Sequence, residues 1–123
     1  MNAPGRILIF QTAFLGDVVL TLPLAQTLKR ELPDCRISFV VIPVAASVLE
    51  GHPAVHDVIV YDKKKSQRGL SAAVALTRAL RDRTFDVALV PHRSLRSALI
   101  VAAAGIPRRI GFDTSAGRML LTV

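Results

Sequence analysis

Residues 11–23 have the sequence QTAFLGDVVLTLP, and this stretch decides which fold the rest of the chain can adopt. An apolar run with strand character, Ile7 to Phe10, leads into it, and a helical pattern of apolar residues leaves it. A strand, a turn that contains glycine and a helix start place backbone N–H groups and one carboxylate, Asp17, at the carboxyl end of a sheet. Open α/β folds bind their ligands at that edge, so we expect a ligand site around Gly16 and Asp17.

Short β-branched segments alternate with helical patterns along the whole chain. Strands are predicted at Arg6–Gln11, Arg36–Ile42, Val58–Tyr61, Phe85–Val90 and Arg109–Gly111. This alternation predicts one three-layer α/β/α Rossmann-like domain, residues 1–123, with a parallel sheet and helices on both faces. If the strand order is the doubly wound 3-2-1-4-5, the first and fourth strands are neighbours, and Gly16 and Asp17 lie across a crevice from His92 and Arg93.

The first helix contains a proline that leaves two alternatives for where the helix begins. It either begins near Asp17 and kinks at Pro23, or begins later with Pro23 in its first turn. A continuous apolar stripe across the proline favours the early start, and the helix is expected to end before Pro33. The positions expected to be buried are Val18, Val19, Leu22, Ala25, Leu28 and Leu32.

Three further helices are predicted. A short one covers Pro43–Leu49, and another covers Ala98–Ala104, with Ser94 or Ser97 as its cap. The helix between them is expected to have an apolar face that includes Leu70, Val74, Thr77 and Leu80.

The bulk composition fits a single soluble domain. The chain has 123 residues, 51% of them apolar, which is enough for a sizeable core. Its single cysteine, Cys35, cannot form an internal disulfide, which favours a reducing, cytosolic compartment. No apolar run approaches the ~20 residues of a membrane-spanning helix.

A formal net charge of +7 indicates an anionic partner. Nucleic acid, a phosphorylated sugar or lipid, and an acidic membrane surface all satisfy that requirement. The chain has only six aromatic residues and no helix-turn-helix, RNP-like or KH signature. Nucleic acid is therefore disfavoured, and its only support is the net charge.

Several cations lie where they oppose a helix dipole. Lys63, Lys64 and Lys65 precede one predicted helix, and Arg93 and Arg96 lie at the start of the next. Such placement suits an anion better than it suits the fold, although a solvated loop explains the lysines equally well. The basic residues at a helix C-terminus need no functional explanation: they are Arg78, Arg81 and Arg83.

No metal site is predicted. Three neighbouring residues could be drawn as metal ligands: His52, His56 and Asp57. Histidines four residues apart suit a metal ion when they lie on one face of a helix, but Pro53 prevents a helix there. We expect a polar loop there. Cys35 is expected to be a small buried residue at the start of a strand.

The last residues, Met119 to Val123, are apolar and carry no stop signal. This pattern is typical of a chain cut inside a larger protein.

Three segments, Gln11–Pro23, Pro91–Ser97 and Ala104–Phe112, resemble in order and spacing the N-terminal half of glycosyltransferase family 9, the lipopolysaccharide heptosyltransferases, and most closely the heptosyltransferase II branch. The resemblance implies a GT-B fold of two domains, with residues 1–123 as the acceptor-binding domain and a sugar-nucleotide domain beyond Val123. It also implies inverting transfer of heptose from ADP-heptose to the phosphorylated, lipid A-linked inner core of lipopolysaccharide. The reaction would need no metal or other cofactor and would occur at the cytoplasmic face of the inner membrane, and the fragment alone would be inactive.

The resemblance also implies roles for individual residues. Asp17 matches the carboxylate taken to deprotonate the acceptor hydroxyl, and Ala13 and Phe14 depart from the small polar pair of many members. The acceptor site implied around Asp17 comprises Thr12, Gly16, Lys63, Lys64, Lys65, His92, Arg93 and Arg96.

Two other hypotheses remain open from the residues alone. Asp17 could cap its helix, a role that does not exclude catalysis. The chain could also be a non-catalytic Rossmann-type module that binds a nucleotide or another anion, although the turn has one glycine where the dinucleotide fingerprint has three.

Overall fold

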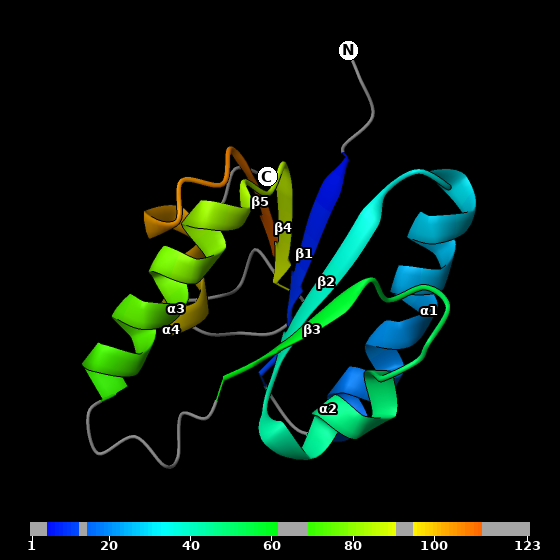
Figure 1. The fold of residues 1–123 in the computed structure, drawn as a ribbon, viewed down its shortest axis with the longest axis horizontal. Coiled ribbons are helices and arrows are strands. Elements are labelled where there is room, and N and C mark those ends of the chain that lie inside the picture. Colours follow the sequence, from blue (N-terminus) through cyan, green and yellow to red (C-terminus); the bar gives the residue numbers. More distant parts are fainter. Residues whose placement is uncertain (1–4, 13–14, 62–68, 91–94, 112–123) are drawn as a thin grey trace.

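The computed structural model describes residues 5–12, 15–61, 69–90 and 95–111. Five strands in these ranges form one sheet in the order β3-β2-β1-β4-β5, and all four pairings are parallel. Helices α1 and α2 cover one face of the sheet, and α3 and α4 cover the other (Figure 1). The predicted three-layer α/β/α fold and the 3-2-1-4-5 strand order are confirmed. The elements are β1 (Arg6–Phe10), α1 (Leu15–Glu31), β2 (Arg36–Val41), α2 (Pro43–Leu49), β3 (Asp57–Val60), α3 (Gly69–Arg83), β4 (Val87–Val90), α4 (Leu95–Ala103) and β5 (Arg108–Gly111).

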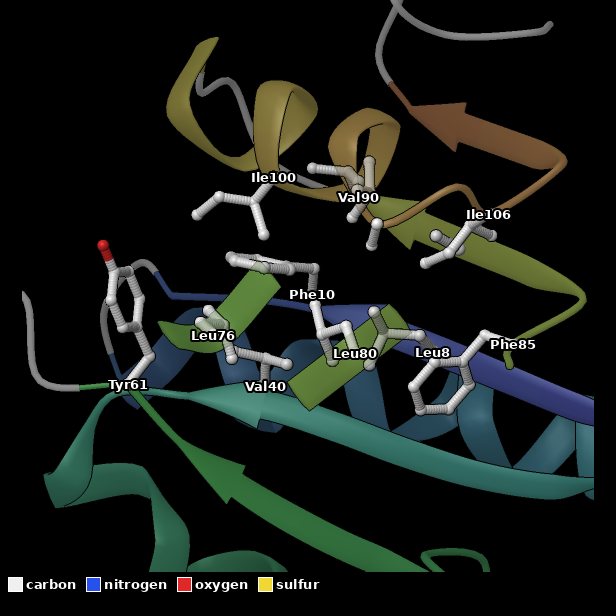
Figure 2. Close-up of a cluster of buried hydrophobic side chains, with 13 residues drawn as sticks. Leu8, Phe10, Val40, Tyr61, Leu76, Leu80, Phe85, Val90, Ile100 and Ile106 are labelled. Carbon is white, nitrogen blue, oxygen red and sulfur yellow. The ribbon is translucent and has the colours of Figure 1, made fainter. Parts of the chain in front are cut away.

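The central strand, β1, is apolar after Arg6 because both of its faces are buried there. Leu8 and Phe10 join the core beneath α3 and α4, which Figure 2 shows. Ile7 and Ile9 point to the opposite face and join the core beneath α1 and α2. A single short strand therefore connects both halves of the hydrophobic core.

Helix α1 has the early start that its apolar stripe indicates, since Pro23 lies inside it. Val18 and Ala25 are fully buried, and Leu22, Leu28 and Leu32 pack partly against the same cluster. The prediction for Val19 was wrong, because its side chain is 45% exposed. Val19 follows Val18 by about 100° around the helix axis, so only one of the two can face the sheet.

The predicted apolar face of α3 is confirmed at Leu80, which is buried, and Thr77 is partly buried, but the prediction for Val74 was wrong. Leu76 and Leu80 are buried, whereas Val74 is 44% exposed. Ala73 packs partly against the same core, so the stripe advances in steps of three and four residues, as helix geometry requires. Val74 lies outside this stripe. The side chain of Leu70 lies outside the described residues.

Helix α4 begins at Leu95, three residues before the predicted start. Ser97 is consequently its third residue, buried in the helix, and does not occupy the capping position. Ser94 lies outside the described residues. Helix α2 has the predicted bounds, and the other element boundaries differ from the predicted ones by at most two residues, because local sequence fixes element type better than element ends.

The segment between α2 and β3 is a loop, as predicted. His52 Nδ1 accepts a hydrogen bond of 3.1 Å from the backbone N–H of Ala54, which stabilises the turn around Pro53. Cys35 is buried before β2 as expected, and burial raises the pKa of its thiol. None of the helices in the described ranges is both long and apolar enough to cross a membrane.

The orientation of α3 can be tested with two substitutions of similar chemistry. Leu80→Ala should lower the free energy of unfolding by about 2–5 kcal/mol, because it leaves a cavity between α3 and the sheet. Val74→Ala should change it by less than about 0.5 kcal/mol, because the side chain faces solvent. Urea denaturation of both variants measures the difference. Equal losses would contradict the orientation described above.

Candidate functional site

The predicted site lies at the carboxyl edge of the sheet, where β1 and β4 end side by side. Their register, Ile7 with Val87 and Ile9 with Leu89, places the ends of both strands at the same level. The first turn of α1 begins at this edge, at the lower end of the sheet in Figure 1. The strand order changes direction at β1, which is where open α/β sheets bind ligands.

Asp17 is the third residue of α1 and lies in its first turn, half-buried. Since the helix begins at Leu15, Asp17 does not occupy the capping position before the helix, and the capping hypothesis was wrong. Its carboxylate still lies where the partial positive charge of the helix N-terminus stabilises an anion. The first turn of α1 therefore places one carboxylate at the carboxyl edge of the sheet.

A buried hydrogen-bond network ties the start of α1 to the end of β1. Gln11 Nε2 donates to Thr21 Oγ1 at 3.3 Å, and Thr21 Oγ1 donates to the backbone carbonyl of Asp17 at 2.7 Å. Gln11 also donates from its backbone N–H to the carbonyl of Val40, at 2.9 Å. Gln11 and Thr21 are 2% and 6% exposed. The backbone at Asp17 is therefore held against the sheet by buried polar groups.

Sequence reasoning missed this network, although one signal was present. Thr21 is a polar residue on the buried face of α1, between Val18 and Ala25. A polar side chain in that position requires a buried partner, and the polar residue at the end of the preceding strand, Gln11, supplies it.

Gly16 and Thr12 differ in accessibility. Gly16 is the second residue of α1 and is exposed, and a Cβ atom added there would meet no atom within 4 Å. The fold itself therefore does not require glycine here, and the surface beside Asp17 is open. Thr12 follows β1 and is 3% exposed.

The predicted basic groups are only partly described. Arg96 is the second residue of α4, so it lies in the first turn of that helix, as expected. The side chain of Arg96 lies outside the described residues. The same holds for all of the other predicted polar groups at this edge, Lys63, Lys64, Lys65, His92 and Arg93.

Tyr61 adds an unpredicted polar group at the same edge. It directly follows β3, and its backbone N–H donates to the carbonyl of Val41 at 2.8 Å. Its ring lies near Val40 and Leu76 at one side of the core cluster (Figure 2). Within the described part of the chain, its buried hydroxyl has no hydrogen-bond partner. A buried hydroxyl that stays unpaired costs about 1–3 kcal/mol.

The described residues contain no cluster of three or more His, Cys, Asp or Glu side chains that could hold a metal ion. The chemistry that the described edge offers is therefore that of one carboxylate beside an open helix N-terminus.

Comparison with known proteins gives these features a family context. Residues 73–122 match the model of glycosyltransferase family 9 (heptosyltransferase). The chain is 27% identical over 107 residues to lipopolysaccharide heptosyltransferase 2 of Escherichia coli, covering 87% of this chain and 31% of that protein. It is 30% identical over 116 residues to lipooligosaccharide heptosyltransferase 2 of Haemophilus influenzae, covering 94% and 33%. The solved structure of E. coli ADP-heptose lps heptosyltransferase II superposes with a TM-score of 0.80 at 27% identity, covering 94% of this chain and 33% of that one.

These matches all point to glycosyltransferase family 9. They agree with the predicted family. The chain spans about a third of the length of the relatives it matches. Those relatives are named for heptose transfer to lipopolysaccharide or lipooligosaccharide, while the comparisons assign no role to Asp17 or to the basic residues.

The buried network can be tested with a pair of threonine substitutions. Thr21→Val keeps the side-chain shape but removes both hydrogen bonds of the hydroxyl, so it should lower the free energy of unfolding by about 1–2 kcal/mol. Thr27→Val makes the same change at an exposed position of α1 and should cost less than about 0.5 kcal/mol. Denaturant titration of both variants measures the difference, and equal costs would show that the network contributes nothing.

Proposed function

We propose that this chain is the acceptor-binding half of an inverting heptosyltransferase, which moves heptose from ADP-heptose to the phosphorylated inner core of lipopolysaccharide. The observation that carries the proposal is the position of Asp17, in the first turn of α1 at the switch point of a family 9 sheet. The names of the relatives support ADP-heptose as the donor and lipopolysaccharide as the class of acceptor.

In this proposal residues 1–123 form the N-terminal acceptor domain of a GT-B protein. The relatives are about three times as long as this chain, which supports a second domain that binds the sugar nucleotide. The active site would then be assembled from both domains. The chain alone should turn over no ADP-heptose, so activity assays require the complete protein.

The proposed chemistry uses Asp17 as a general base. The carboxylate accepts the proton of the acceptor hydroxyl while that oxygen forms a bond to the anomeric carbon of the heptose. The bond from the anomeric carbon to ADP breaks at the opposite face, and its electron pair leaves with the diphosphate, so the configuration inverts. A fixed base of this kind contributes roughly 10²–10⁴-fold in rate. The Gln11–Thr21 network supports this role, because it fixes the backbone that carries Asp17.

The phosphates of the acceptor are proposed to bind the cations at the carboxyl edge. Arg96 supports this, because a cation in the first turn of α4 is unfavourable for the helix itself. The partners proposed for the same anionic groups are Lys63, Lys64, Lys65 and Arg93, with Thr12, Gly16 and His92 completing the acceptor site.

We further propose that the protein associates peripherally with the cytoplasmic face of the inner membrane, where its lipid-linked acceptor resides. Exposed apolar side chains on α1 and α2 support this, and Leu20 is the most accessible of them at 78%. The first turns of α1 lie close to α2 (Figure 1). The exposed apolar residues of the two helices are Leu15, Val19, Leu20, Leu24, Val44 and Val48.

Asparagine at position 17 tests the proposed base. In the complete protein, Asp17→Asn should reduce turnover by about 10²–10⁴-fold, because the amide cannot accept the proton. The free energy of unfolding should fall by no more than about 1 kcal/mol, the value of a carboxylate in a first helical turn. Initial rates of transfer from ADP-heptose and thermal denaturation measure the two effects.

Asp34→Asn is the matched control, since it removes an exposed carboxylate after the far end of α1. It should leave turnover unchanged. Near-normal turnover in Asp17→Asn would eliminate Asp17 as the base and make His92 the next candidate. If the unaltered complete protein transfers no sugar, the non-catalytic binding module becomes the better hypothesis.

The arginines at the start of α4 can be tested separately. Replacing Arg93 and Arg96 by Ala in the complete protein should raise the KM for the acceptor and leave the KM for ADP-heptose unchanged. Stability should stay equal or improve, because the change removes a cation from the first turn of α4. Steady-state kinetics and melting temperatures check both effects. As a control, Arg78→Ala changes an exposed arginine of α3 and should leave both KM values unchanged. A lower melting temperature with an unchanged acceptor KM would make the two arginines structural.

A further inference from the structure

A second basic region lies at the opposite edge of the sheet from Asp17. The amino ends of β1, β2 and β3 and the last turn of α3 meet there, at the upper end of the sheet in Figure 1. They enclose a cavity of about 140 Å³, well above the roughly 10–15 Å³ that a single water molecule needs. Its lining residues are Arg6, Arg36, Ser38, His56, Asp57, Arg83 and Phe85. We call this space the amino-edge cavity.

Two arginines of the amino-edge cavity face each other across neighbouring strands. Arg6 of β1 is directly in register with Arg36 of β2. Because parallel strands lie about 4.8 Å apart, these two side chains leave the sheet from adjacent positions on the same face. Like charges at adjacent positions repel each other, and an anion bound between them would remove that repulsion.

The single carboxylate that lines the cavity, Asp57, is paired with Arg83. Asp57 accepts hydrogen bonds from the Ser38 hydroxyl and from the Arg83 guanidinium, with which it also forms an ion pair. Burial raises the pKa of the Asp57 carboxyl, but these hydrogen bonds and the charges of Arg83 and His56 outweigh it and leave the pKa below its usual value. Asp57 therefore stays ionised and balances Arg83.

Arg6 and Arg36 keep most of their donors available. Arg6 donates one N–H to the backbone carbonyl of Arg83, which leaves four of the five N–H groups of its guanidinium. In the described ranges, the guanidinium of Arg36 has neither a carboxylate nor a carbonyl partner. The nearby Asp86 accepts the backbone N–H groups of Gly5 and Arg6 at 2.9 and 3.0 Å, and within the described ranges it forms an ion pair with neither guanidinium.

One feature works against an anion at this place. The last carbonyl groups of α3 carry partial negative charge, and α3 ends beside the cavity. The hydrogen bond from Arg6 to the carbonyl of Arg83 offsets part of that charge. Two guanidinium groups without a carboxylate partner outweigh what remains, because each carries a full charge.

We propose that the amino-edge cavity binds one phosphate group, through Arg36 and Arg6 with His56 beside them. A tetrahedral oxoanion matches the paired guanidinium forks, and the volume suits one phosphate group better than a nucleotide. This site lies at the other end of the strands from Asp17 and is independent of the proposed transfer reaction.

Phosphate binding to the chain can be measured by two-dimensional ¹H–¹⁵N spectra and by melting temperature. Inorganic phosphate should shift the amide signals around Arg36 and His56 saturably at constant ionic strength. Arg36→Gln should weaken the fitted Kd at least 10-fold. Without phosphate this variant should melt at the same or a higher temperature than the unaltered chain, because a repulsive pair is removed.

Arg108→Gln is the matched control, because it removes the same charge from the same sheet edge outside the cavity lining. It should leave the Kd unchanged, which separates site binding from charge screening and from the general stabilising effect of phosphate salts. Equal weakening in both variants, or shifts that never saturate, would overturn the proposal. A lower melting temperature of Arg36→Gln with an unchanged Kd would make Arg36 structural and would also overturn it.

A separate measurement tests whether the phosphate group comes from a lipid headgroup or from a soluble compound. If the chain binds vesicles that contain phosphatidylglycerol, and both free phosphate and Arg36→Gln abolish that binding, the group belongs to a lipid headgroup. If phosphate binds while these vesicles do not, the group belongs to a soluble phosphate compound. Loss of heptose transfer in Asp17→Asn has no bearing on either result, because the two sites lie at opposite sheet edges.

Discussion

The parallel pairing of β1 with β2 on one side and β4 on the other is the constraint on which the rest of the structure depends. Every side chain of β1 after Arg6 is buried, alternately toward the two helical layers. Its backbone forms ladder hydrogen bonds to both neighbours, which extend beyond the strand from Gln11 to Val40 and from Asp86 to Arg6. β1 therefore packs against a helical layer on each face and pairs with a strand on each side. A shift of its register would disrupt both hydrophobic clusters and both sets of ladder hydrogen bonds.

This central position also separates two kinds of chemistry along one strand. The carboxyl end of β1 leads to Gln11, Thr21 and the first turn of α1, which carries Asp17. The amino end begins with Arg6, which faces Arg36 and the end of α3. A strand of five residues is about 17 Å long, so the two edges do not share a ligand. The proposed base and the proposed phosphate site therefore act independently.

The helix termini explain why the two edges differ in charge. In a parallel α/β sheet every helix begins at the carboxyl edge and ends at the amino edge. Cations near helix ends, such as Arg81 and Arg83, are stabilising at the amino edge, and Arg81 donates to the carbonyl of Ala103 at 3.0 Å. The same rule makes Arg96 unfavourable at the start of α4 and Asp17 favourable at the start of α1. Arg81 and Arg83 therefore need only a structural explanation, whereas the unfavourable position of Arg96 supports a ligand there.

The sequence by itself determined the α/β/α class, the element order, the early start of α1 and the position of Asp17 at the carboxyl edge, because these follow from apolar periodicity and from the strand–helix alternation. It did not determine which face of each helix packs on the sheet. Val19 and Val74 fit a local apolar pattern but are exposed to solvent, because the sheet beneath decides which apolar residues of a helix are buried. It also did not show the contacts between Gln11 and Thr21 or between Arg6 and Arg36, because these residues are 10 and 30 positions apart. Only the register of the folded sheet and the packing of helices against it bring them together, and tertiary structure alone fixes that register.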